Sequence, residues 1–156
     1  MPEFTAQTVY FHQPGKANTA RTLQLAVERA NQLNINTILV ATTSGESGKQ
    51  TAQAFQGKNV ITVSHACGYK GPNTQELTRE NRAAIEAAGA AILTCQHAFG
   101  GVNRALRKQL DTTGPDEIIA NTLRIFGEGM KVVAEIAIMA ADAGLVQVGE
   151  PVLCIA

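Results

Sequence analysis

The sequence contains no tryptophan, and its 156 residues include only three cysteines and equal numbers of basic and acidic side chains, 13 of each. The cysteines, Cys67, Cys95 and Cys154, are odd in number and far apart, so no disulfide framework is expected. The longest basic cluster, residues 104–108, holds three charges on a predicted helix and is interpreted as its solvated face. A neutral chain without a basic stripe and interleaved aromatic residues is not expected to bind nucleic acid.

Long apolar runs are also lacking. The most apolar segment, residues 132–146, is interrupted by Glu135 and Asp142 and is shorter than a membrane span. The first residues do not show a charged region followed by an apolar one, so no signal peptide is predicted. We therefore expect a cytoplasmic protein without a membrane partner. A chain of this length is expected to form a single domain, over residues 1–156.

Short apolar runs alternate with segments that carry apolar residues at helical spacing. One helix is predicted at residues 19–33, with Asn18 as its N-cap, and another at residues 102–110, with Val102, Leu106 and Leu110 among its apolar residues. A helix at residues 130–143 is apolar nearly all round and should be central. This β-α-β order predicts the α/β class, with a three-layer α/β/α fold around a mainly parallel sheet. Strands are predicted at residues 8–11, 37–41, 60–63, 90–93 and 151–155.

A loop of small residues follows the predicted strand at residues 37–41 and leads into a helix. Its glycines permit tight turns and close approach of a ligand, and the free N–H groups of a helix start favour an anion, usually a phosphate. The loop is not a Walker A motif, because two residues separate its glycines where that motif has four. The alternative is an ordinary helix start that is capped by Ser44 or Ser47 and needs no ligand. The predicted phosphate loop consists of Thr42, Thr43, Ser44, Gly45, Glu46, Ser47 and Gly48.

The carboxyl ends of parallel strands lie along one edge of a sheet, so the loops that follow four of the strands should converge there. His65 and His97 lie in two of these loops and are the candidate catalytic residues, because imidazole titrates near neutral pH. The alternative is that each histidine bonds a neighbouring backbone group and shapes its loop. Further ligand contacts are predicted for Gly15, Asn18, Thr19, Tyr69, Phe99, Gly100 and Gly101.

Two other groups of side chains are weaker candidates. The two histidines could form a Cys₂His₂ set with Cys67 and Cys95, but neither half has zinc-site spacing, so no metal site is predicted. Lys131 and Glu135 lie four residues apart in the predicted central helix and are interpreted as an ion pair that orients it. The alternative places the carboxylate in the crevice or at a subunit interface.

Residues 43–48 and the strand before them resemble the C-terminal domain of pyruvate kinase, in which a similar Ser-Gly-x-Ser loop binds the phosphate of an allosteric sugar phosphate. The whole chain resembles more closely a family of small stand-alone proteins with that domain's fold. The resemblance implies an FMN-like phosphate ligand at the strand-end crevice. It also implies no pyruvate kinase activity, because the catalytic barrel is absent. Glu46 differs from the basic residue of pyruvate kinases, so a sugar bisphosphate is not expected. The stretches that carry the resemblance are residues 9–19, 25–30, 126–136 and 139–144.

The sequence thus predicts a domain that binds a small phosphorylated molecule, FMN-like or a sugar phosphate, at the carboxyl edge of its sheet. One alternative is an enzyme that uses flavin or histidine acid–base chemistry on a small phosphate ester. Another is a structural subunit, since the apolar helix at residues 130–143 also predicts a homo-oligomer.

Overall fold

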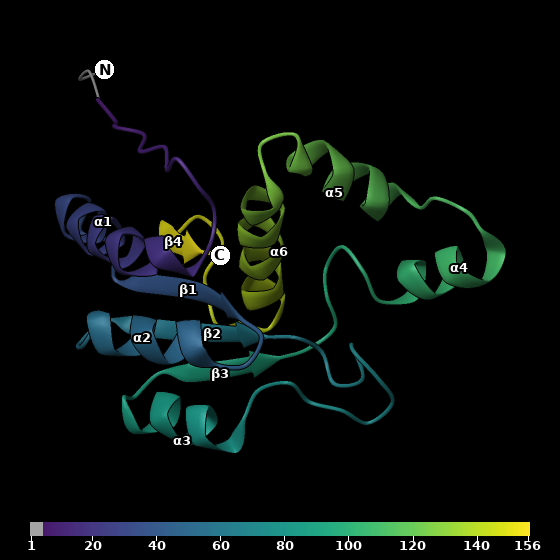
Figure 1. Cartoon of the computed structure of the whole chain (residues 1–156), viewed down its shortest axis with the longest axis horizontal. Coiled ribbons are helices and arrows are strands. Elements are labelled where there is room, and N and C mark those ends of the chain that lie inside the picture. Colours follow the sequence, from purple (N-terminus) through teal and green to yellow (C-terminus); the bar gives the residue numbers. More distant parts are fainter. Residues whose placement is uncertain (1–4) are drawn as a thin grey trace.

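The computed structural model describes residues 5–156, which form a four-stranded sheet and six α-helices (Figure 1). Most elements lie where the apolar runs and helical patterns predict them. The elements are a 3₁₀ helix η1 (Lys16–Asn18), α1 (Thr19–Gln32), β1 (Thr37–Thr42), α2 (Glu46–Ala54), β2 (Asn59–Ser64), α3 (Arg79–Ala87), β3 (Ala91–Thr94), α4 (Val102–Leu110), α5 (Pro115–Arg124), α6 (Glu128–Asp142) and β4 (Val152–Ile155).

The sheet is parallel throughout and its strand order is β3-β2-β1-β4. The register places Leu39 of β1 between Ile61 of β2 and Cys154 of β4. The chain crosses from β1 to β2 in one direction and later returns to the other side of β1 to form β4. The predicted α/β class with a parallel sheet is therefore confirmed.

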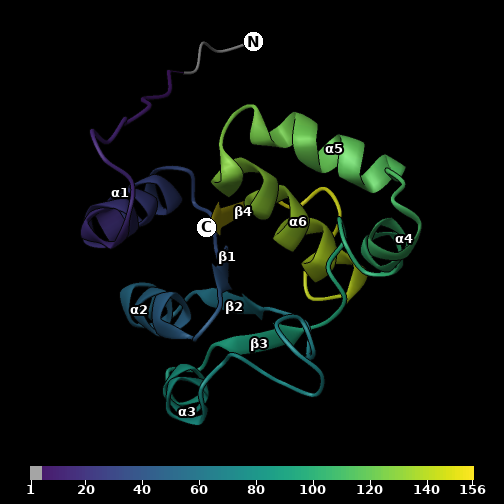
Figure 2. The same ribbon diagram turned by 45° about the vertical axis from the view of Figure 1, so that its right-hand side comes forward.

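Side chains alternate across the sheet and give it two apolar faces. Ile38 and Val40 of β1 pack with α1, α2 and α3 on one face, whereas Leu39 packs with Ile136 and Met139 of α6 on the other. Figure 2 shows the three layers, with α1, α2 and α3 on one side of the strands and α6 on the opposite side. Since each face buries a continuous apolar layer, the hydrophobic effect holds both helical layers on the sheet.

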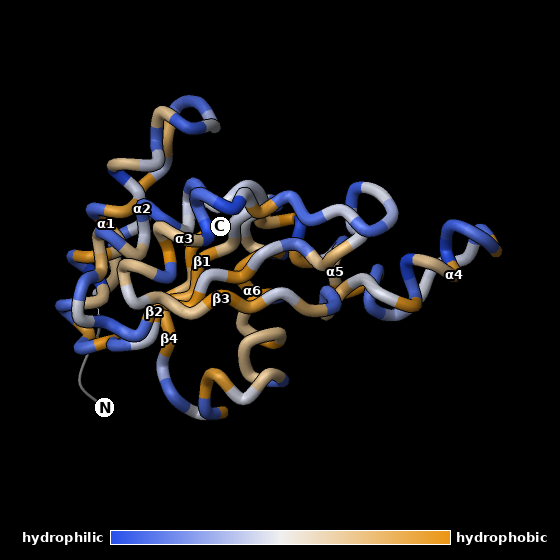
Figure 3. The backbone as a smooth tube through the Cα atoms, turned by 90° about the horizontal axis from the view of Figure 1, so that it is seen from below, coloured by the Kyte–Doolittle hydropathy of each residue, from blue (hydrophilic) through white to orange (hydrophobic). Residues whose placement is uncertain are grey.

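Helices α4 and α5 extend away from the sheet as an arm, seen at the right of Figure 1. The apolar side of α4 faces solvent: Val102 and Leu110 are each 65% exposed and Leu106 is 42% exposed. Figure 3 shows apolar positions of α4 at the far end of the tube, remote from the core. The apolar residues of this helix therefore do not pack on the sheet, because α4 lies beyond its edge.

The predicted strand at residues 8–11 is wrong. This segment forms no regular structure, and Tyr10 is 88% exposed. Its β-branched and aromatic residues favour a strand only where a neighbouring strand is available for pairing. Thr5, Gln7, Val9 and Phe11 instead line a groove of about 840 Å³ beside α1 and β4, so the segment passes the sheet without joining it.

Asn18 occupies the N-cap position of α1, as predicted, but its side chain does not cap the helix. The Asn18 amide donates instead to the Gln13 carbonyl, at 2.6 Å, and so closes the loop before the helix. Within residues 5–156, no helix combines the length and the apolar character needed to cross a bilayer.

Candidate functional site

A cavity of about 860 Å³ opens at the carboxyl ends of β1, β2 and β4. The strand order reverses between β1 and β4, and in open α/β sheets ligands bind in the crevice at such a reversal. Helix α2 begins on one side of the cavity, and α6 forms the other side through Val132, Ile136 and Met139. The topology alone therefore positions this cavity where the loops were predicted to converge.

The start of α2 has no side-chain cap. Its N-cap residue is Gly45, whose φ of 101° is a left-handed conformation that glycine adopts without strain. The Gly45 N–H donates to Thr42 Oγ1 at 3.0 Å, which folds the loop back on β1. The alternative of a helix capped by Ser44 or Ser47 is therefore wrong. The first-turn N–H groups, which have no intrahelical acceptor, are left beside the cavity.

The start of helix α3 is hydrogen-bonded to this loop. The Ser44 carbonyl accepts hydrogen bonds from the Thr78 N–H at 3.1 Å and from the Asn81 amide at 3.0 Å. A Cβ atom on Gly45 would stand 2.5 Å from both Asn81 Cβ and Leu77 Cδ1, so only glycine allows this close approach. These contacts hold the loop in place at the rim of the cavity, which Ser44, Glu46 and Ser47 line.

Glu46 is the acidic residue of this helix start, and its charge is compensated locally. Its carboxylate accepts from Lys49 Nζ at 2.9 Å and from the Gln50 amide at 2.8 Å. The hydrogen bond from Lys49, supported by that from Gln50, lowers the pKa of Glu46. Lys49 and Gln50, three and four residues further along α2, hold the carboxylate against the helix. This reduces its repulsion of an anion in the cavity.

His65 is held by a carboxylate from its own long loop. Its Nδ1 donates to Glu76 Oε2 at 2.7 Å, and both side chains are partly buried. This bond fixes the ring and leaves Nε2 without a hydrogen-bond partner among residues 5–156. Because His65 lines the cavity, it presents an imidazole with an oriented, unoccupied nitrogen.

His97 is more tightly constrained. Its Nε2 accepts the Ala66 N–H at 3.2 Å, so the neutral ring carries its proton on Nδ1. That nitrogen lies 3.7 Å from Glu135 Oε2. His97 thus joins the loop after β2 to α6, as the alternative of a loop-shaping histidine anticipated.

Glu135 and Lys131 form a buried ion pair on α6, in which 4% and 8% of the residues' surfaces are exposed. Glu135 also accepts the Phe99 N–H at 3.0 Å. Burial alone would raise the pKa of Glu135, but the nearby His97 ring and the hydrogen bonds from Lys131 and Phe99 outweigh it and lower the pKa to about 2. The expected ion pair forms, and it binds the loop after β3 through Phe99; both residues also line the cavity, as the alternative anticipated.

Three rings form a mutually contacting cluster at the edge of the cavity, in which the His65 and His97 ring centroids lie 5.4 Å apart. Tyr69 stacks on His97 with a 4.8 Å centroid separation and lies 4.1 Å from the His65 ring centroid. The guanidinium of Arg104 lies over the Tyr69 ring, 4.1 Å from the ring centroid. Tyr69 and His97 therefore form a wall between this cavity and a second cavity.

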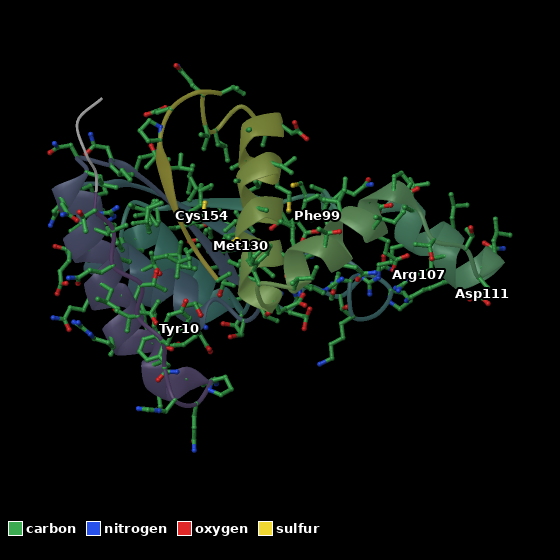
Figure 4. All side chains as sticks on the ribbon, turned by 90° about the horizontal axis from the view of Figure 1, so that it is seen from above. Tyr10, Phe99, Arg107, Asp111, Met130 and Cys154 are labelled. Atoms are coloured by element: carbon green, nitrogen blue, oxygen red, sulfur yellow. The ribbon has the colours of Figure 1, made fainter. Side chains whose placement is uncertain are left out.

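The second cavity, of about 700 Å³, lies between the loops after β2 and β3 and the helices α4, α5 and α6. Tyr69, His97, Lys131 and Glu135 line both cavities. Arg107 of α4 also lines this cavity, where it pairs with Glu117 of α5. Figure 4 shows Arg107 on the arm and Phe99 beside α6.

The predicted ligand residues divide into three groups. Gly15, Asn18, Gly45 and Gly48 do not line either cavity, and Gly48 packs on β2, where its Cβ would stand 2.5 Å from Thr62 Cγ2. The second cavity is lined by Phe99, Gly100 and Gly101 together with Tyr69 and His97. The strand-end cavity is lined by Thr19, Thr42, Thr43, Ser44, Glu46, Ser47, His65, Tyr69 and His97.

Sequence reasoning missed Glu76 and Arg104. Glu76 follows its histidine by eleven residues in an irregular loop, where no periodic pattern indicates the pairing. Arg104 carried a usable signal, since it follows the glycines of a predicted strand-end loop by three residues. Within residues 5–156, no three His, Cys, Asp or Glu side chains gather as a metal site would require.

The fold and this crevice define a class: a parallel α/β domain with a ligand-sized cavity at the reversal of its strand order. Residues 20–156 match the family described as pyruvate kinase, alpha/beta domain. Because the match covers most of the 156 residues, the chain belongs to this family, and the expected resemblance is confirmed.

Proposed function

We propose that this domain binds a small phosphorylated molecule, FMN-like or a sugar phosphate, in the strand-end cavity. The observation that carries the proposal is the uncapped start of α2 at the rim of a cavity of about 860 Å³. Helix starts of this kind favour phosphate through their free N–H groups and the positive end of the helix dipole. The volume lies within the range of small-molecule sites.

The side chains around the helix start support the same ligand chemistry. Thr43, Ser44 and Ser47 supply hydroxyl donors, and Lys16 supplies a cation, at one end of the cavity. The organic part of the ligand would lie between the Tyr69 and histidine rings and the apolar side chains of α6. A flavin offers a flat ring for this environment. The proposal includes no pyruvate kinase activity.

The test is a thermal-shift panel of FMN, sugar phosphates, nucleotides and inorganic phosphate. A ligand at one hundred times its dissociation constant should stabilise the native state by about 2.7 kcal/mol, which raises the melting temperature measurably. The shift should be lost in Ser44→Ala/Ser47→Ala, whose hydroxyls make no hydrogen bond within residues 5–156. It should persist in Thr112→Ala/Thr113→Ala, which removes two exposed hydroxyls remote from the cavity. No shift with any phosphorylated compound would refute the proposal.

A second candidate is acid–base chemistry on the bound phosphate ester, with His65 and His97 as the predicted catalytic residues. The observation that favours it is the His65–Glu76 pair, which leaves His65 Nε2 free at the cavity. His97 Nε2 already accepts a backbone N–H, so the geometry favours His65 as the proton acceptor. His65→Gln should then abolish turnover while ligand affinity changes only a few fold, whereas equal losses of affinity and turnover would argue for a binding role.

A homo-oligomer stays a prediction, and its interface is better assigned to the arm formed by α4 and α5 than to α6. Ile125 and Phe126 are 77% and 75% exposed at the end of α5, and the apolar side of α4 is exposed as well. Exposed apolar side chains that gather on a surface mark association sites. Size-exclusion chromatography with light scattering should show an oligomer that Ile125→Ser/Phe126→Ser dissociates, and a monomeric native chain would refute the prediction.

A further inference from the structure

The second cavity has an unusual wall. Helix α4 turns Arg104, Arg107 and Lys108 toward the cavity, at the i, i+3 and i+4 positions of one helical face. Its opposite side, with Val102 and Leu110, faces solvent. A surface helix in water places its apolar side inward and its charges outward. The basic side of α4 thus lines an open cavity, in which Arg104 is partly buried whereas Arg107 and Lys108 are also exposed to solvent.

The charges around this cavity do not balance. Five of its lining side chains are cationic and three are acidic. Arg107 is paired with Glu117, Lys131 with Glu135, and Arg124 with Glu128, which lies outside the lining. Arg104 and Lys108 have no carboxylate within ion-pair distance in the described part of the chain. Against these two cations stands the Asp116 carboxylate, which accepts a hydrogen bond from the Asn103 amide, so one positive charge is left in excess around the cavity.

Arg104 is held in position for binding. Its guanidinium lies over the Tyr69 ring, 4.1 Å from the ring centroid, and Tyr69 in turn stacks on His97. Stacking fixes the plane of the guanidinium while its N–H edges remain available, and these edges match the geometry of phosphate and carboxylate oxygens. Long arginine side chains otherwise lose conformational entropy when they bind, so this pre-ordering favours anion binding.

We propose that the second cavity is an oxyanion subsite in which Arg104, assisted by Lys108, binds a phosphate or carboxylate group. The inference extends the proposed function, because Tyr69 and His97 separate this subsite from the strand-end cavity. The ligands of this domain would then include compounds with two anionic groups, one at the start of α2 and one at Arg104.

The experiment is a site-resolved NMR titration of the whole chain with inorganic phosphate, and separately with acetate, at constant ionic strength. Signals of the Glu46 and Ser47 amides report on the start of α2, and the Arg104 Nε–Hε and Gly101 amide report on the subsite. We expect saturable shifts at both places with phosphate. Saturation by acetate at the subsite would identify a carboxylate as an acceptable second group, and acetate without effect would restrict the subsite to phosphate.

Arg104→Gln should weaken phosphate binding at the subsite at least about tenfold, the effect of removing one charge-assisted hydrogen bond. Binding at the start of α2 should persist. Arg104→Lys should restore part of the affinity, and Arg79→Gln, which removes an exposed arginine of α3, should have no effect. Circular dichroism of each variant verifies the fold.

The two proposals fail separately in this experiment. Shifts at α2 alone, or an unchanged subsite in Arg104→Gln, overturn the subsite and leave the proposed function. Shifts at the subsite alone, lost in Arg104→Gln, support the subsite and count against the phosphate loop. Absence of saturable shifts at both places overturns the two proposals together.

Discussion

Removal of the Glu135 charge should destabilise the fold strongly. The carboxylate is almost fully buried, pairs with Lys131 and accepts the Phe99 N–H. Glu135→Gln has nearly the same shape, so it creates no cavity and isolates the effect of the charge. It leaves the Lys131 ammonium buried without a counter-charge, and breaking a buried pair in this way costs about 3–5 kcal/mol. Domains of this size unfold with about 5–15 kcal/mol, so the expected loss is a large fraction of the total.

The free energy of unfolding is best measured by urea denaturation with far-UV circular dichroism, since the chain has no tryptophan. The matched control is Glu128→Gln, which breaks the Arg124–Glu128 pair at the same spacing but on an exposed surface, and should cost less than about 1 kcal/mol. Lys131→Met/Glu135→Gln should cost less than the sum of its single substitutions, because it removes both buried charges. Equal costs for Glu135→Gln and the control, or additive single substitutions, would refute the reasoning.

Three further predictions concern pH, thiols and packing. The pKa of Glu135 falls from 4.5 to about 2 on folding, so the ionised carboxylate stabilises the native state by about 3 kcal/mol. This stabilisation should be complete above pH 4.5 and lost as the pH falls to 2. Urea midpoints across this range should show the loss in the native chain and not in Glu135→Gln. With a chromogenic disulfide reagent the exposed Cys67 should react first and Cys154 last, because burial raises the pKa of the Cys154 thiol to about 11; fast reaction of Cys154 in the folded chain would contradict this. Gly48→Ala should cost about 1–3 kcal/mol in urea denaturation, because its methyl group would overlap a buried threonine of β2, whereas Gly129→Ala, at an open helical position, should cost nothing.

The sheet and its carboxyl edge were predictable because they depend on local pattern. The strand at β1 is a continuous apolar run, which indicates burial on both faces, and the loop after it carries the turn residues of a helix start. Parallel order then places Thr42, Ser64 and Thr94 at one edge, whatever the details of packing. The convergence of hydroxyl and histidine residues followed from topology.

The failures concern contacts that no local pattern encodes. Residues 8–11 have the composition of a strand, but a strand requires a neighbouring edge at the right distance. The apolar residues of α4 face solvent although the helix is amphipathic, because the helix lies beyond the edge of the sheet. The partnership of His65 with Glu76 arises inside an irregular loop, where sequence spacing gives no geometry.

The wall formed by Tyr69 and His97 has a thermodynamic consequence. Its two faces belong to different cavities, so any molecule that immobilises the rings from one side alters the surface offered on the other. Binding free energies at the two places are then linked, and the linkage is reciprocal: the factor by which the first molecule changes the affinity for the second equals the factor by which the second changes the affinity for the first. Contacts among these side chains would thus transmit occupancy from one cavity to the other.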